Sequence, residues 1–187
     1  MNIEIETKVK VESLDEIAVR LSDVGGQLEC ELSQVDTYFD DTEGTLFVSD
    51  CGLRLRQQII GESEKVILTH KGPRQEARFK SRQEIETEVS DFEVAAQLLT
   101  ALGYEKTLVF EKRRQVWRLA DCEVCLDELP LLGSFVEIEA PGEGQIGDVL
   151  EKMELAHLGH INESYAQLMR AKLNELGSGK MEAFFND

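Results

Sequence analysis

Charged and apolar residues alternate along several short segments of the chain, with the period of a β-strand. Residues 3–10 read I-E-I-E-T-K-V-K, and the same period recurs in residues 53–56, 84–89, 110–114 and 136–139. Successive side chains of a strand point to opposite faces. A single segment of this kind is typical of a half-buried strand with its charged face in solvent. Its recurrence predicts a closed sheet with a polar interior and helices over its apolar outer faces.

Two helices are predicted from capping signals and helical periodicity. Residues 14–24 follow the capping-box spacing Ser13-x-x-Glu16, and residues 92–102 follow Ser90-x-x-Glu93. Glycines come directly after both segments, as is common where helices end. We expect each helix to pack its apolar stripe against the sheet.

Two further helices are predicted near the C-terminus, at residues 145–158 and 162–176, the second capped by Asn162. Residues 177–187 are predicted to form a frayed, flexible tail. Residues 41–44 indicate a turn, and residues 74–82 a mobile, positively charged loop or strand edge. The remaining strands are predicted at residues 34–40, 53–60, 65–71, 107–119, 122–127 and 134–140.

The chain contains an internal repeat. Residues 84–89 match residues 4–9 at every position except one, and each segment precedes a helix and further strands. We interpret the chain as two related strand–helix–strands halves, about residues 1–80 and 81–176. Two halves of about four antiparallel strands each would close into a barrel of about eight, an α+β fold with flanking helices.

Composition limits the class of protein. The 187 residues suffice for one domain with a sizeable core. The net charge of -17 argues against nucleic acids and anionic membranes as partners, so bound phosphate requires local clustering of Lys and Arg. The absence of a membrane-length apolar run or a signal-peptide pattern predicts a cytoplasmic protein.

Two short motifs have structural explanations. Cys122 and Cys125 form C-x-x-C, but a strand points these thiols to opposite faces, which favours packing over a zinc or redox site. Residues 142–147 fit G-x-G-x-x-G, but no strand long enough for a parallel βαβ unit follows. We interpret residues 142–147 as a loop and a helix start.

The charges of the predicted interior have two chemical uses. Carboxylates are the ligands that Mg²⁺ and Mn²⁺ prefer, whereas Arg and Lys bind phosphate oxygens. The candidate metal ligands are Glu4, Glu6, Glu137 and Glu139, and the candidate phosphate ligands include Arg54, Arg56, Lys71, Lys112 and Arg114.

In order, these segments resemble the CYTH family, the triphosphate tunnel metalloenzymes that include class IV adenylyl cyclases, thiamine triphosphatases and inorganic tripolyphosphatases. The E-x-E-x-K hallmark stands at residues 4–8. The resemblance extends to about residue 176 and also rests on T-Y-F-D at 37–40, L-R-L-R at 53–56, K-G-P at 71–73, S-R-x-E-x-E at 81–86, E-K-R-R at 111–114, L-D at 126–127, G-x-F-V-E-I-E at 133–139 and S-Y at 164–165.

The resemblance implies a single CYTH domain over residues 1–176 with a triphosphate bound along an eight-stranded tunnel. Tyr165 would lie on a helix that closes one mouth, although a packed aromatic explains it equally well. The implied metal ligands are Glu4, Glu6, Glu137 and Glu139, with Glu84 and Glu86 as supporting tunnel carboxylates. The implied triphosphate ligands are Lys8, Arg54, Arg56, Lys71, Arg82, Lys112 and Arg114. The candidates for a catalytic role are Lys8, Lys71, Lys112 and Tyr165.

Three functions are compatible with these residues. The segments K-G-P, E-K-R-R and G-x-F-V-E-I-E favour an adenylyl cyclase that converts ATP to cyclic AMP and pyrophosphate with Mg²⁺ or Mn²⁺. A triphosphatase for thiamine triphosphate or inorganic tripolyphosphate uses the same machinery. A non-catalytic nucleotide- or polyphosphate-binding module is the third interpretation. The sequence is compatible with a homodimer but does not establish one.

Overall fold

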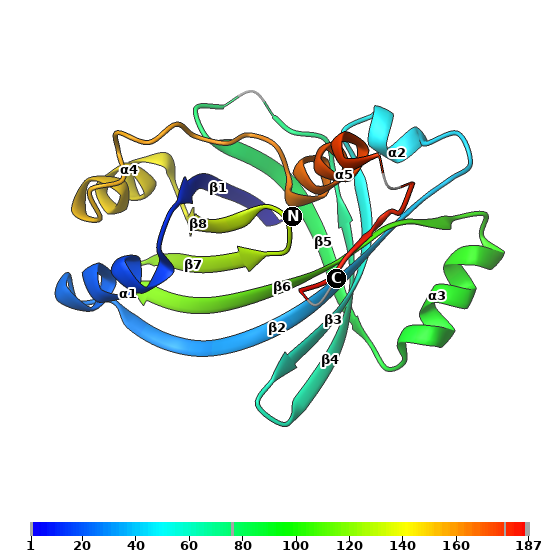
Figure 1. The fold of residues 1–187 in the computed structure, drawn as a ribbon, viewed down its shortest axis with the longest axis horizontal. Helices are drawn as coiled ribbons and strands as arrows, with labels where there is room; N and C mark the ends of the chain where they lie inside the picture. The colour runs from blue at the N-terminus through cyan, green and yellow to red at the C-terminus, as the bar shows by residue number, and fades with distance from the viewer. Residues whose placement is uncertain (1, 76, 178, 186–187) are drawn as a thin grey trace.

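The computed structural model describes residues 2–75, 77–177 and 179–185, with side chains from Glu4 onward. Eight long strands and a short ninth form one sheet, with five helices around it (Figure 1). The strands are β1 (Asn2–Val11), β2 (Gln27–Asp40), β3 (Gly52–Ile60), β4 (Ser63–Lys71), β5 (Lys80–Val89), β6 (Glu105–Leu119), β7 (Cys122–Leu129), β8 (Gly133–Ala140) and β9 (Glu182–Ala183). The helices are α1 (Leu14–Asp23), α2 (Thr45–Val48), α3 (Phe92–Ala101), α4 (Glu143–Lys152) and α5 (Tyr165–Leu176).

The eight long strands close into an antiparallel barrel. Their order is β2-β3-β4-β5-β1-β8-β7-β6, and β2 pairs with β6 to complete the circle. The first strand lies between β5 and β8, so this strand of the first half has both of its partners in the second half. The predicted closed α+β barrel is therefore confirmed. The relation between the two halves stays a prediction from the sequence.

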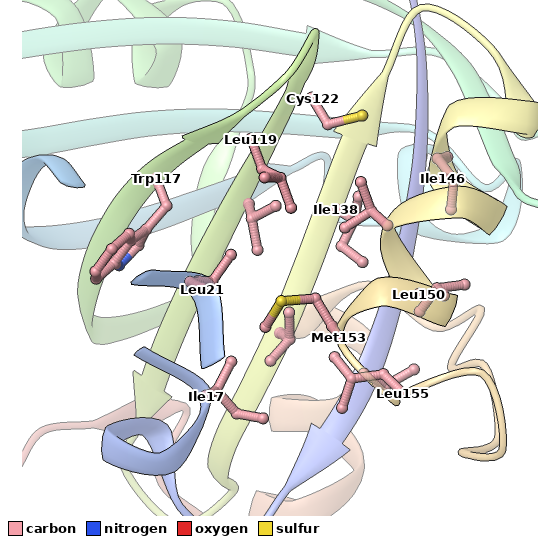
Figure 2. Packing of buried hydrophobic residues seen from close by; sticks show 14 of the residues in the cluster. Ile17, Leu21, Trp117, Leu119, Cys122, Ile138, Ile146, Leu150, Met153 and Leu155 are labelled. Carbon is pink, nitrogen blue, oxygen red and sulfur yellow. The ribbon is translucent and has the colours of Figure 1, made fainter. Parts of the chain in front are cut away.

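The outer face of β1, β7 and β8 is covered by α1 and α4. Figure 2 shows Ile17 and Leu21 of α1 and Ile146 and Leu150 of α4 over the same sheet surface as Ile138 of β8. These side chains are buried, and burial of a large aliphatic side chain contributes about 1.5–3 kcal/mol. Because the apolar residues of β1, β7 and β8 pack on this outer side, the charged residues that alternate with them face inward.

One end of the barrel interior is filled by α5. Met169 and Leu173 of α5 pack with Leu108 and Phe110 of β6, which lie on the same face of that strand as Lys112. The predicted helix therefore covers one mouth of the barrel. Another apolar cluster, under α3, lies on the outer side of β3 and β4.

Two predicted helix caps are wrong by one and two residues. The N-cap of α3 is Asp91, not Ser90, and its carboxylate accepts from the backbone N–H of Val94 at 2.8 Å. The N-cap of α5 is Ser164, not Asn162, and a full capping box forms with Gln167. Each segment offers two capping residues within three positions, and in both the later residue caps the helix.

The prediction of a helix over residues 145–158 is also wrong in its bounds. The helix α4 spans Glu143–Lys152, and the chain turns at Glu154, whose φ of 56° is left-handed. Leu155 and Leu158 still join the core, so the apolar pattern extended beyond the helix itself. Residues 142–147 form a loop and helix start as predicted, and the next element is α5 instead of a parallel strand.

Part of the predicted tail, β9, lies against the barrel. In β9, Ala183 is buried among Phe110 and Leu173, and β9 pairs in parallel with β6. This edge of β6 is available because β7 pairs only with residues 113–119 of that strand. The predicted frayed tail therefore does not describe residues 182–183.

Several element boundaries differ from the sequence prediction. Strand β2 begins at Gln27, before the predicted 34–40 segment, and β5 begins at Lys80 within the predicted loop. The short helix α2, after the 41–44 turn, was not predicted. Cys122 lies in the outer core whereas Cys125 neighbours Arg114, so the two thiols face opposite sides, as expected. Within the described parts of the chain, helices are too short or too polar to cross a membrane.

Candidate active site

The interior of the barrel is a cavity of about 230 Å³. It is lined by every residue that the sequence assigned to the site: Glu4, Glu6, Lys8, Arg54, Arg56, Lys71, Arg82, Glu84, Glu86, Lys112, Arg114, Glu137, Glu139 and Tyr165. The strand register explains this convergence, because Glu6 faces Glu139, and Lys8 faces Glu137, across the β1–β8 pair. Which of these residues binds metal or phosphate remains a prediction.

Two carboxyl groups of the cavity have raised pKa values. Burial and repulsion from Glu84 and Glu139 raise the pKa of Glu4 to about 8. Burial and repulsion from Glu123 and Glu6 raise the pKa of Glu139 to about 7. Close carboxylates in a partly buried site disfavour each other's charge, and a cation placed among them would relieve this repulsion.

Two other carboxylates are held ionised by lysines. Burial and repulsion from Glu137 would raise the pKa of Glu6, but its ion pair with Lys80 and the nearby Lys8 hold that pKa below the ordinary value. Likewise, burial would raise the pKa of Glu137, but Lys8 at 3.5 Å and Arg114 at 2.9 Å hold it well below.

The donor set fits a divalent cation whose coordination is completed by a substrate. Across the described ranges, no three His, Cys, Asp or Glu side chains form a group that could hold a metal ion as they stand. Mg²⁺ is ordinarily bound through one or two carboxylates together with waters and substrate phosphates, so a closed protein cage is not required. The carboxylates of Glu4 and Glu139, which repel each other, are the donors least engaged with cations.

Asp36 orients two arginines of the neighbouring strand β3. Its carboxylate accepts from Nε of Arg56 at 2.6 Å and from Nη2 at 2.8 Å, while Arg54 lies 3.9 Å away. Burial would raise the pKa of Asp36, but the two guanidinium groups hold it far below its usual range. The pair is therefore ionised at every working pH and keeps both arginines pointed into the cavity.

Arg54 has unused donor capacity. Its Nη2 donates to Thr69 at 3.0 Å and to Glu86 at 3.1 Å, and Thr69 also donates to Glu86 at 2.7 Å. Its Nε is buried and has no hydrogen-bond partner among the residues that the structure describes. A buried donor without a partner costs free energy, which a bound anion would recover.

Arg82 of β5 also has buried donor atoms without hydrogen-bond partners among the described residues. It is 4% exposed, and neither Nε nor Nη2 makes a hydrogen bond within the described chain. Asp50 approaches Nη2 only to 3.6 Å, because its carboxylate already accepts from Arg74 at 2.7 Å. Lys71 lies nearby, ion-paired with Glu84.

Asp127 joins three of the predicted site residues. It is fully buried, accepts two hydrogen bonds from Arg114 at 2.6 Å each, and accepts one from the Tyr165 hydroxyl at 2.8 Å. Lys112 lies 3.8 Å from the same carboxylate. Burial and repulsion from Arg114 lower the pKa of Lys112 to about 7. Tyr165 also carries Lys8 over its ring, 4.1 Å from the centroid.

The sequence analysis did not assign several residues of the cavity. Asp36 and Lys80 stand two residues from Tyr38 and Arg82 on inward-facing strand positions, so the period of two could have identified them. Asp127 lies in a segment that resembles the family, but its role as a shared anchor depends on which strands become neighbours. Asp50 and the helix α2 carry no periodic signal.

The sequence as a whole was compared with known protein families. The family model for the CYTH domain matches residues 2–167. The chain belongs to the CYTH domain family. The proteins of this family are metal-dependent tunnel enzymes that act on small-molecule triphosphates. The cavity described above is the tunnel of this CYTH domain.

Similar proteins carry related names. A Methanocaldococcus jannaschii protein named putative adenylate cyclase is 30% identical over 150 residues, which cover 80% of this chain and 81% of the relative. The structure of the PH1819 protein from Pyrococcus horikoshii OT3 has a TM-score of 0.78 at 27% identity, covering 90% of this chain and 99% of that one.

A plant protein shares the fold at lower identity. The Hippeastrum protein described as a putative adenylyl cyclase with a dominant triphosphatase activity has a TM-score of 0.67. It is 17% identical, and the match covers 91% of this CYTH chain and 96% of that protein. Its likeness establishes the common architecture.

Proposed function

We propose that this CYTH protein binds a triphosphate and a divalent cation in its tunnel and cleaves a phosphoanhydride bond as a class IV adenylyl cyclase, converting ATP to cyclic AMP and pyrophosphate. The observation that supports this most strongly is the buried, unpartnered donor atoms of Arg54 and Arg82 in one cavity with carboxylates of raised pKa. Such a site combines donors for phosphate oxygens with ligands for a hard cation.

The arginines and the glutamates of the tunnel have different proposed roles. Arg54, Arg56 and Arg82 are fixed guanidinium groups that would hold the phosphates, and fixed charges stabilise a transition state without reorganisation. Glu4, Glu6, Glu137 and Glu139 would hold Mg²⁺ or Mn²⁺, which supplies charge neutralisation at the breaking phosphorus–oxygen bond.

Lys112 could exchange a proton near neutral pH. Its pKa of about 7 lies where a general acid or base works best. With Lys8 and Tyr165 next to it, this lysine stands at the closed end of the tunnel, under α5. Lys71 is the remaining candidate for a catalytic role, on the opposite wall.

A triphosphatase is the second candidate, because the same charged tunnel serves attack of water on a terminal phosphorus and the Hippeastrum protein of this fold is described with that activity. Incubation of the pure protein with Mg²⁺ or Mn²⁺ and either ATP, thiamine triphosphate or tripolyphosphate separates the candidates. Cyclic AMP with pyrophosphate supports the cyclase. Orthophosphate without cyclic AMP overturns it in favour of hydrolysis.

Binding without turnover of any of these compounds would assign a non-catalytic module. The double variant Glu4→Gln, Glu6→Gln tests the metal role in the same assay, with Glu12→Gln, beyond the end of β1, as the control. We expect the double variant to lose metal-dependent turnover by at least about 100-fold while the control retains it. An unchanged rate in the double variant would remove these glutamates from the site.

A further inference from the structure

One part of the tunnel lining has no use in phosphate chemistry. The strands contribute charged side chains, but α2 and α5, together with the starts of β3 and β6, contribute a mostly uncharged section at the same cavity. Its residues are Leu46, Phe47, Cys51, Gly52, Thr107 and Ala166. The two helices lie next to each other beside the barrel (Figure 1).

Phe47 is held firmly although it lies on a helix of only four residues. The buried carboxylate of Asp40 accepts from the backbone N–H groups of Leu46 and Phe47, both at 2.9 Å. Asp41 accepts from the N–H of Thr45 at 2.9 Å. These bonds fasten α2 to the end of β2, so the Phe47 ring keeps its place at the cavity while 45% exposed.

Arg170 of α5 completes this surface. Its guanidinium lies over the Phe47 ring, 4.6 Å from the centroid, and its Nη2 donates to Thr107 at 3.2 Å. Its Nε is buried and, within the described parts of the chain, has no hydrogen-bond partner. The pair therefore presents a flat aromatic surface beside a fixed cation with an unused donor.

A planar, neutral heterocycle matches this surface. Aromatic rings and guanidinium planes both stack on bases, and a guanidinium N–H pairs with ring nitrogens or exocyclic oxygens. The permanently positive thiazolium ring of thiamine would meet the positive charge of Arg170, and bare tripolyphosphate has no ring to place there.

We propose that Phe47 and Arg170 form the binding surface for the base of a nucleoside triphosphate whose phosphates occupy the charged section of the tunnel. This rests on the proposed function, which names ATP as the substrate, and adds the residues that select it: Phe47 and Arg170 make the protein prefer a nucleoside triphosphate over tripolyphosphate and thiamine triphosphate. Phe47 and Arg170 are specificity-determining residues and take no part in holding phosphate.

The test is a comparison of dissociation constants for ATP, thiamine triphosphate and tripolyphosphate by calorimetry, in EDTA so that no ligand is turned over. In Phe47→Ala we expect ATP binding to weaken by roughly tenfold or more, and tripolyphosphate binding to change less than about twofold. Val48→Ala is the matched control, because Val48 is 82% exposed on the same helix and lies outside the lining. Phe47→Tyr retains the ring and should bind ATP as the wild type does.

Arg170→Met should likewise weaken the binding of ATP but not of tripolyphosphate, and it should reduce the discrimination against thiamine triphosphate. Lys172→Met of the same helix is the control. Equal losses for ATP and tripolyphosphate would assign Phe47 and Arg170 to phosphate binding or to folding and overturn the proposal. Unchanged ATP affinity in Phe47→Ala would overturn it too. Wild-type protein that forms cyclic AMP while Phe47→Ala keeps the wild-type ATP affinity refutes this inference alone. Wild-type protein that binds tripolyphosphate but not ATP refutes the proposed cyclase as well, and failure to bind any triphosphate, with or without Mg²⁺, refutes the proposed function as a whole.

Discussion

At the scale of single residues, the site depends on buried carboxylates that orient cations. Asp36 and Asp127 are each buried and each bind an arginine through two hydrogen bonds. Pairs of this kind contribute little net stability, but loss of one partner leaves an uncompensated buried charge. Their value lies in fixing where Arg56 and Arg114 point.

Replacement of the buried anchor should therefore be costly. In Asp127→Asn, Arg114 keeps only Glu137 as a counter-charge, and we expect the free energy of unfolding to fall by about 3–5 kcal/mol in urea denaturation. Glu128→Gln is the neighbouring control, since Glu128 and its partner Arg113 are largely exposed and 3.4 Å apart. Equal stability of the two variants would show that the Asp127 cluster is not coupled to the fold.

The pKa of Lys112 predicts how binding responds to pH. Below pH 7 this lysine is charged in the folded protein and attracts phosphate, and above pH 7 that attraction is lost. Tripolyphosphate affinity, measured by calorimetry in EDTA, should therefore fall more steeply with rising pH in the wild type than in Lys112→Met. Parallel affinity curves for the two proteins would contradict the assigned pKa.

The free energy of unfolding should rise with pH, whereas the affinity for tripolyphosphate should fall. The folded-state pKa of Lys112 lies below its ordinary value of 10.5, so between about pH 7 and 10.5 the unfolded chain binds the additional proton. This lysine therefore contributes an increase in the free energy of unfolding as the pH rises through that window, and Lys112→Met should lack it.

At the scale of elements, the helices are set by packing as much as by their capping residues. The helix α5 carries Tyr165 and Arg170 into the tunnel, so the residue at which it begins determines the depth of both side chains. Ser164 satisfies the N–H of Gln167 at 3.2 Å, and Gln167 satisfies the N–H of Ser164 at 2.8 Å. This reciprocal pair fixes the first turn.

Two variants distinguish the observed N-cap of α5, Ser164, from Asn162, the N-cap expected from the sequence. Ser164→Ala should lower the free energy of unfolding by about 1 kcal/mol because the first turn loses its acceptor. Asn162→Ala should have little effect, because only the backbone carbonyl of Asn162 makes a described contact, with Arg74 at 3.1 Å. Thermal denaturation of both variants distinguishes the two caps, and a larger loss in Asn162→Ala would place the cap there after all.

At the scale of the whole molecule, an acidic protein concentrates its positive charge in one interior space. The net charge is -17, yet the tunnel gathers arginines and lysines on several strands. Bulk solvent screens charges on the outer surface, whereas the low-dielectric walls of the cavity focus the field of the charges that line it. Anionic ligands should therefore bind at a single saturable site.

The increase in the free energy of unfolding on ligand binding measures the affinity of this site for anions. Tripolyphosphate at about 100 times its dissociation constant should raise the free energy of unfolding by about 2.7 kcal/mol. At the same ligand concentration the increase should be smaller in Arg54→Met and equal to that of the wild type in Arg20→Met, because Arg20 lies on α1, outside the barrel, and pairs with Glu154 at 3.6 Å. An identical increase in all three proteins would exclude Arg54 from the binding site.

The alternating charges of β1 and its counterparts predicted the barrel, its polar interior and part of the lining, and the resemblance to the family added Lys8, Arg82, Glu84, Glu86 and Tyr165 to the candidate site. The reason is local, since the period of two places Glu4, Glu6 and Lys8 on one face wherever that strand lies. Once the outer faces are buried under helices, the inner faces must share one space.

Only the tertiary structure decided which charges are neighbours. The raised pKa of Glu4, the sharing of Asp127 and the surface formed by Phe47 and Arg170 each join segments distant in sequence. Such contacts depend on strand order, register and helix docking, which are global properties of the packed chain. The docking of β9 follows the same rule, because the free edge of β6 exists only after β7 has paired with the other end of that strand.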